Sequence, residues 1–172
     1  MSMHPLHNYF KDYKGNCNVF VETGTNTGGG VTLAVMAGFQ EIHTVDIKEQ
    51  KDPSYKHGLK NIYYHIGDSS EVLRKILPTL KGKKIMFWLD AHSSLLPGDE
   101  ESYPLVSELE VIKKSGVNNA TILIDDFLYM SHPDVTGWSS EYIVSLIKSI
   151  NKDYKIEYLS NPIMNNILIA RV

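Results

Sequence analysis

The chain has 172 residues, of which 42% are hydrophobic and 22% charged, with a net charge of −3 and one cysteine, Cys17. These values predict a single globular domain over 1–172 and exclude an intrachain disulfide or a cluster of metal-bound thiolates. No apolar run reaches about 18 residues, which excludes a membrane-spanning helix, and residues 1–16 are too polar for a signal peptide. No basic run marks a nucleic-acid surface, and the lone cysteine favours a reducing, cytoplasmic location.

Strands and helices alternate along the chain, which predicts an α/β protein. Residues 1–16 form an N-terminal extension. Apolar runs then predict strands at 18–22, 41–46, 61–65, 84–90, 120–125, 154–159 and 166–171. Helical spacing predicts helices at 29–37, 69–80, 104–115 and 139–151, with a short helical turn near 48–58. Candidate N-caps are Ser69, Ser70, Ser139 and Ser140. The irregular stretches are 91–103 and 126–138.

The first strand leads into a glycine-rich turn. Residues 20–30 read FVETGTNTGGG, so the strand ends at the acid Glu22 and a helical run follows the glycines. Glycines let the backbone approach a ligand closely and adopt positive φ. The spacing differs from the dinucleotide fingerprint, because Thr25 and Asn26 follow Gly24 directly. An ordinary tight turn between a strand and a helix is the alternative interpretation.

A second acid, Asp46, ends the second strand 22 residues after Gly24. A carboxylate in this place can accept two hydrogen bonds from a ribose diol. A solvated acid at a strand end is the alternative. Together, the loop and the acid in one strand–helix–strand unit favour a nucleotide-like ligand.

These motifs, with a closing strand pair joined by SNPIM, resemble class I S-adenosylmethionine-dependent methyltransferases over residues 17–172. The resemblance implies a three-layer α/β sandwich. Its seven-stranded, mostly parallel sheet would have the order 3-2-1-4-5-7-6 with the last strand antiparallel. It also implies that S-adenosyl-L-methionine is the cofactor and that Asp68 faces the adenine amine, although Asp68 is equally a candidate helix N-cap. The cofactor-binding residues so implied are Glu22, Gly24, Thr25, Asn26, Gly28, Asp46, Asp68, Ser69 and Asp90.

Acids also follow the fourth and fifth strands, which are neighbours in this order. FWLDAHSS contains Asp90 and His92, and ILIDDF contains Asp125 and Asp126. Clustered carboxylates repel one another, and a divalent cation such as Mg²⁺, Mn²⁺ or Ca²⁺ relieves this repulsion. The pattern is similar to that of metal-dependent macrocin-type O-methyltransferases. This similarity implies Asp90, Asp125 and Asp126 as metal ligands, with Asp90 and His92 as catalytic residues. His92 would be a nearby base, an additional metal ligand or a substrate contact. The alternatives are acids that bond to loop backbone and an ordinary loop histidine.

The resemblance implies methyl transfer to the hydroxyl of a small molecule, with saccharides as one candidate class. The chain lacks the spaced lysine-aspartate-lysine-glutamate tetrad of cap ribose methylation, the Pro-Pro-Tyr motif of base amino-group methylation and the Pro-Cys motif of cytosine methylation. Two alternatives stay open: a non-catalytic module that binds S-adenosylmethionine or another nucleotide, and a metal-dependent hydrolase. The sequence predicts no oligomeric state.

Overall fold

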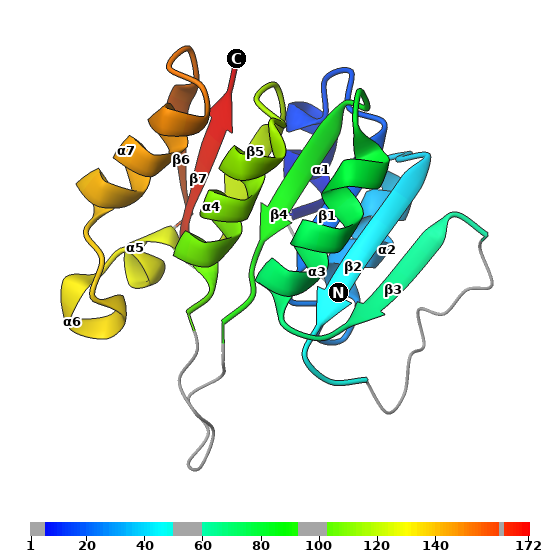
Figure 1. Ribbon diagram of the computed structural model, residues 1–172, viewed down its shortest axis with the longest axis horizontal. Helices are drawn as coiled ribbons and strands as arrows, with labels where there is room; N and C mark the ends of the chain where they lie inside the picture. Colours follow the sequence, from blue (N-terminus) through cyan, green and yellow to red (C-terminus); the bar gives the residue numbers. More distant parts are fainter. Residues whose placement is uncertain (1–5, 50–59, 93–102, 162–163) are drawn as a thin grey trace.

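The computed structural model describes residues 6–49, 60–92, 103–161 and 164–172. Seven strands form one sheet in the order β3-β2-β1-β4-β5-β7-β6, which confirms the predicted order. All pairs from β3 to β5 are parallel, and β7 is antiparallel to both β5 and β6. The arrows of β2 and β4 therefore point down in Figure 1, whereas that of β7 points up.

The strands agree with the predicted ranges to within two residues at each end. Their bounds are Val19–Thr23 (β1), Glu41–Asp46 (β2), Ile62–Ile66 (β3), Ile85–Leu89 (β4), Thr121–Ile124 (β5), Lys155–Asn161 (β6) and Met164–Arg171 (β7). Every residue of β1 and β4 is buried. Central strands of a parallel sheet are covered on both faces, and this explains their continuous apolar sequences.

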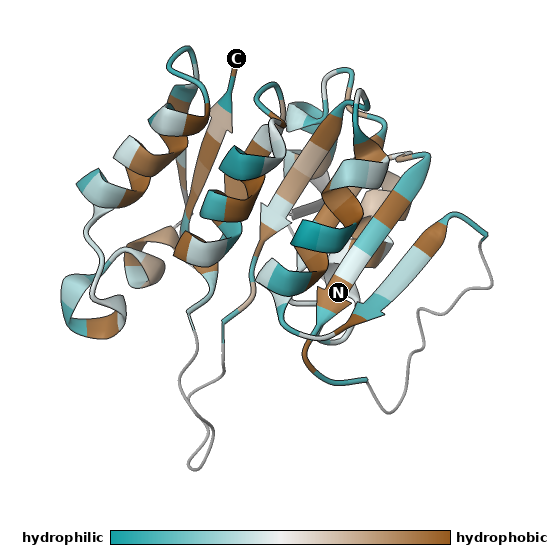
Figure 2. Cartoon of the chain, viewed as in Figure 1, coloured by the Kyte–Doolittle hydropathy of each residue, from teal (hydrophilic) through white to brown (hydrophobic). Residues whose placement is uncertain are grey.

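Helices cover the sheet on both sides and complete three layers. Their bounds are Leu6–Tyr13 (α1), Gly29–Met36 (α2), Ser69–Ile76 (α3), Leu77–Leu80 (the 3₁₀ helix η1), Leu105–Ser115 (α4), Phe127–Met130 (α5), Pro133–Thr136 (α6) and Ser140–Ile150 (α7). In Figure 1, α3, α4 and α7 lie in front of the sheet, and α1 and α2 lie behind it. Figure 2 shows the apolar stripes of the front helices beside polar outer faces, as expected for helices on a core.

The ends of two helices test the predicted caps. The N-cap of α3 is Asp68, which confirms one of the candidates over Ser69 and Ser70, and its side chain accepts a hydrogen bond from the Glu71 amide. The same helix passes into η1 near Pro78, because proline has no amide to continue the α-helical ladder. Ser139 caps α7 as predicted.

Three short helices were not predicted. Helix α1 lies within the predicted extension, and its Phe10 is fully buried against Phe20 and Trp88. Helices α5 and α6 lie within 126–138, which was predicted to be irregular. The predicted turn near 48–58 falls almost entirely outside the described residues.

Cys17 is a free cysteine and is buried. In the described part of the chain, no helix has the length and apolar character needed to cross a membrane.

Candidate active site

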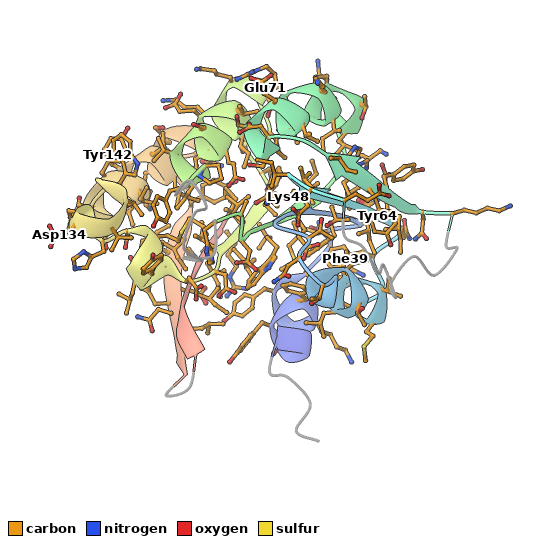
Figure 3. The ribbon with its side chains drawn as sticks, turned by 90° about the horizontal axis from the view of Figure 1, so that it is seen from below. Phe39, Lys48, Tyr64, Glu71, Asp134 and Tyr142 are labelled. Carbon is orange, nitrogen blue, oxygen red and sulfur yellow. The ribbon has the colours of Figure 1, made fainter. Side chains whose placement is uncertain are left out.

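The predicted site residues lie at the carboxyl edge of the parallel strands, which Figure 3 views directly, with Lys48 near the middle. The turn after β1 begins at Gly24, which has a φ of 85°. A Cβ there would overlap the carbonyl oxygen of Asp90 and lie 2.7 Å from its carbonyl carbon. The amides of Gly24 and Thr25 both donate to the carbonyl of Val45, at 2.8 and 3.1 Å. The loop therefore packs directly on the ends of β2 and β4, and only glycine fits at its start.

Beneath this turn, Glu22 is 1% exposed and points toward the start of α2, where a Cβ at Gly30 would overlap its carboxyl. The Thr44 hydroxyl donates to Glu22 Oε2 at 2.6 Å, and Thr25 Oγ1 lies 2.6 Å from the same hydroxyl. Burial raises the pKa of Glu22 to about 8. Glu22 thus supports the loop from within through Thr44. Thr44 was not among the predicted site residues, although a threonine within a buried strand indicates a buried hydrogen-bond partner.

We expect Glu22 to make the folded state less stable as pH rises. Its carboxyl stays protonated in the folded chain up to about pH 8, while in the unfolded chain it ionises near its ordinary pKa of 4.5. The contribution of Glu22 to the free energy of unfolding is therefore complete below about pH 4.5 and is lost as pH rises through about 8. Each unit of pKa shift corresponds to about 1.4 kcal/mol of this free energy. Urea unfolding at several pH values should show Glu22→Gln gaining stability relative to wild type across this window.

The matched control for that measurement is Glu110→Gln, an acid on the outer part of α4 that pairs with Lys114. It should follow the wild-type pH dependence. A wild-type curve that is flat or rising between about pH 5 and about pH 8 would contradict a protonated Glu22.

Asp46 ties the glycine loop to β2. Its carboxylate accepts hydrogen bonds from the Asn26 amide at 2.8 Å and from the Lys48 amide at 3.2 Å. Asn26 has a φ of 44°, a left-handed conformation that asparagine tolerates better than most residues. Gly28, with a φ of 80°, is the N-cap residue of α2. These contacts place Asp46 beside the loop, as the ribose prediction requires.

Asp68 lies at the same edge, at the start of α3. Its Oδ1 accepts hydrogen bonds from Ser70 Oγ at 2.6 Å and from the Glu71 amide at 3.0 Å. These bonds lower the pKa of Asp68, the Ser70 hydroxyl contributing most. Its role as a helix cap is therefore confirmed, and the contact with adenine stays a prediction. Ser69 is buried, with its hydroxyl turned toward the interior.

The ends of β4 and β5 bring an acid–histidine cluster together. His92 Nε2 lies 3.1 Å from Asp126 Oδ2 and 3.6 Å from Asp90 Oδ1. One ligand atom of each residue lies within 4.8 Å of the others. The cluster adjoins the glycine loop, because the Asp90 carbonyl packs against Gly24. His92 thus lies between two of the predicted acids, and its catalytic role stays a prediction.

Asp125 takes a different place from its two predicted partners. Its Oδ1 accepts a hydrogen bond from the Asp126 amide at 2.9 Å, and it is not one of the three residues of the cluster. It still acts on the cluster: burial, and next the charge of Asp125, raise the pKa of Asp90 to about 7. Asp126 has a φ of 48°. In the described residues, Asn26 and Asp126 are the two non-glycine residues with positive φ, and both lie at this edge, where strained backbone often marks function.

Two tyrosines form a wall next to the histidine. The ring of Tyr129 in α5 lies 6.3 Å from the ring of His92, and the hydroxyls of Tyr129 and Tyr103 are 3.2 Å apart. Both rings pack against the core. Tyr129 therefore places an aromatic ring next to the candidate base, and Tyr103 packs beside Tyr129.

The donor set of the cluster fits a divalent cation. Two carboxylates and one imidazole suit Mn²⁺ or another first-row metal, whereas Ca²⁺ prefers oxygen ligands alone. The raised pKa of Asp90 points the same way, because a cation would compensate the crowded negative charge. The structure thus brings His92, rather than Asp125, together with Asp90 and Asp126, and the binding of a metal by these residues stays a prediction.

No family model and no curated protein matches the sequence. Solved structures do match. A protein described as an rRNA methylase from Clostridium thermocellum is 15% identical with a TM-score of 0.61, over 99% of this chain and 98% of the other. An O-methyltransferase from Bacillus cereus in complex with S-adenosylhomocysteine is 11% identical with a TM-score of 0.65, over 100% of this chain and 82% of the other. A protein described as a caffeoyl-CoA O-methyltransferase from Staphylococcus aureus is 13% identical, with a TM-score of 0.61 over 99% and 84%.

At these identities the likeness establishes the fold. The chain has the fold of S-adenosylmethionine-dependent methyltransferases, which agrees with its strand order and its closing antiparallel strand.

Proposed function

We propose that this protein is an S-adenosylmethionine-dependent methyltransferase that acts on a hydroxyl group of a small molecule. One observation carries the proposal: the glycine loop and the acid–histidine cluster share a backbone contact, between Gly24 and the carbonyl of Asp90. A cofactor held by the loop would therefore lie beside a group able to accept a proton. A module that only binds a nucleotide does not need such a cluster, and a hydrolase does not need such a loop.

The residues that would hold the cofactor fit its chemistry. Gly24 leaves room for close approach, and Asp46 offers carboxylate oxygens beside the loop for a ribose diol. Asp68 lies at the start of α3, where its carboxylate would contact the adenine amine. When bound, S-adenosylmethionine supplies an activated methyl group, so the protein mainly has to position the acceptor.

The cluster would remove the acceptor's proton. His92 Nε2 lies in hydrogen-bond range of Asp126. In the tautomer that carries its proton on Nε2, this N–H donates a hydrogen bond to Asp126, and the lone pair of Nδ1 is left to act as the base. Asp126 orients the ring and stabilises its charged form. Alternatively, Mg²⁺ or Mn²⁺ held by Asp90, His92 and Asp126 would lower the pKa of the acceptor hydroxyl. Tyr103 and Tyr129 would contact the acceptor.

Calorimetry with S-adenosylhomocysteine tests the cofactor half of the proposal. We expect binding by the wild type, and a loss of about 1–3 kcal/mol for Asp46→Ala, which removes the diol acceptor and the bond to Asn26. Asp46→Asn keeps one acceptor oxygen and should lose less. Asp153→Ala, an exposed acid before β6, is the control and should bind as the wild type does.

The absence of any heat with millimolar S-adenosylhomocysteine would overturn the proposal at its base. Binding without turnover of any hydroxyl acceptor would leave the non-catalytic module. Turnover of an RNA acceptor would keep the enzyme class and refute the small-molecule acceptor.

A further inference from the structure

A buried polar cluster lies behind the cofactor loop, on the side of the sheet that α3 and α4 cover. Its members are Thr23 at the end of β1, Ser69 at the start of α3 and Glu108 in α4. They are 0%, 7% and 1% exposed. Across the described ranges, Thr23 Oγ1, Ser69 Oγ and Glu108 Oε1 are the buried side-chain atoms that make no hydrogen bond of normal geometry. Buried polar groups are almost always paired, so this cluster requires an explanation.

The three side chains nevertheless lie close enough to act on one another. Burial is the main cause that raises the pKa of Glu108, to about 7, and the hydroxyls of Ser69 and Thr23 oppose this rise. Hydroxyls influence a carboxyl in this way only at close range. Thr23, Ser69 and Glu108 are therefore close neighbours in the interior, although these three atoms have no hydrogen-bond partner.

The cluster connects two cofactor motifs that are far apart in sequence. Thr23 directly precedes Gly24, and its carbonyl accepts a hydrogen bond from the Asp90 amide at 3.1 Å. Ser69 directly follows Asp68, the cap of α3. Glu108 belongs to a third element, and one side chain of α4 thus reaches both motifs from the interior.

We propose that Glu108 is a positioning residue of the cofactor site: its buried carboxyl joins Thr23 to Ser69 and so fixes Gly24 and Asp68 relative to each other. This inference rests on the proposed use of Gly24 and Asp68 by S-adenosylmethionine.

The protonation state of Glu108 decides how well it can join the two hydroxyls. The protonated carboxyl donates to one hydroxyl and accepts from the other, whereas the ionised form only accepts. The ionised form also places a second negative charge near Asp68, which already acts on Glu108 electrostatically. Cofactor binding that requires the joined arrangement should therefore favour protonated Glu108, and affinity should fall as pH rises through about 7.

Other charged groups around α4 do not share this position. Helix α4 packs against α3, η1 and α7. The other charged side chains of these helices are exposed: Glu71, Arg74 and Lys75 on α3, and Glu141 and Lys148 on α7. On α4 itself, Glu110 pairs with Lys114, and Lys113 is exposed. Asp68 is thus the charged neighbour that matters for Glu108.

The first test compares Glu108→Gln with Glu110→Gln, a matched change two residues away on the same helix. Binding of S-adenosylhomocysteine is measured by calorimetry at about pH 6 and about pH 8.5. Wild type and Glu110→Gln should lose about tenfold in affinity at the higher pH, which corresponds to a one-unit rise in the pKa of Glu108 on binding. Glu108→Gln, an uncharged isostere of the protonated acid, should lose clearly less affinity than the wild type does, and the loss that remains comes from Glu22 and Asp90, whose pKa values of about 8 and about 7 lie in the same pH range.

The second test needs no cofactor. In Glu108→Ala, amide hydrogen exchange should speed up by about tenfold at both Gly24 and Glu71, whose amides bond to Val45 and Asp68, and Glu108→Gln should restore protection. The proposal is overturned if Glu108→Gln keeps the wild-type pH dependence, or if both amides stay protected in Glu108→Ala. If the wild type does not bind S-adenosylhomocysteine, the proposed function fails, and exchange alone decides whether Glu108 positions the two motifs.

Discussion

Gly24→Ala should abolish measurable binding of S-adenosylhomocysteine and lower the free energy of unfolding by about 2–4 kcal/mol. Residue 24 has a φ of 85°, a conformation that costs an alanine about 1–2 kcal/mol. The new Cβ would also overlap the Asp90 carbonyl, which is backbone and cannot rotate away. The strand end must then move, and with it the paired amides of Gly24 and Thr25. Urea unfolding and calorimetry measure the two effects.

Gly29→Ala provides the matched control within the same loop. Gly29 is exposed at the first position of α2, and a Cβ there meets nothing within 4 Å. Alanine favours helix over glycine by up to about 1 kcal/mol, so this variant should be as stable as the wild type or slightly more stable. If Gly24→Ala and Gly29→Ala behaved alike, the close approach of Gly24 to Asp90 would not be the reason why residue 24 has to be a glycine.

The sheet could be predicted from sequence because its signals are local. Continuous apolar runs such as Ile85–Leu89 mark buried parallel strands, and acids at their ends mark the edge where parallel strands converge. The glycine loop was predictable for the same reason, since the residues of the turn are also those that a ligand would approach. The strand order came from resemblance to a family rather than from the residues.

Other features depend on contacts that no local pattern shows. Helix α1 is eight residues long and owes its stability to the burial of Phe10 rather than to intrinsic propensity. The sequence treats Asp125 and Asp126 alike, and only the left-handed backbone of Asp126 turns its carboxylate toward His92. The sequence does indicate that Glu108 is buried, because this acid shares the apolar face of α4 with Leu105 and Ile112.

His92→Gln should lower the rate of methyl transfer by about 10²–10⁴-fold while leaving the affinity for S-adenosylhomocysteine unchanged. His92 lies 3.1 Å from Asp126, so both the base and the metal mechanism lose an essential group in this variant. Asp126→Asn should show a similar loss, because it removes the charge that orients and stabilises the imidazole. His132→Gln, on an exposed histidine at the start of α6, is the control and should be fully active. The readout is S-adenosylhomocysteine formed with a panel of saccharide and phenolic acceptors.

Mn²⁺ separates the two mechanisms, and its binding can be measured without an acceptor. If the cluster holds a cation, a titration followed by electron paramagnetic resonance should show one site in the wild type, and Asp90→Asn and Asp126→Asn should each weaken it by at least about tenfold. EDTA should then stop turnover. If the wild type binds no Mn²⁺ and turnover resists EDTA, the cation is ruled out, and His92 acts as the base with Asp126 as its partner. Full activity of His92→Gln would refute both mechanisms, because in each of them the imidazole lies between the two carboxylates and touches the acceptor or its activating ion.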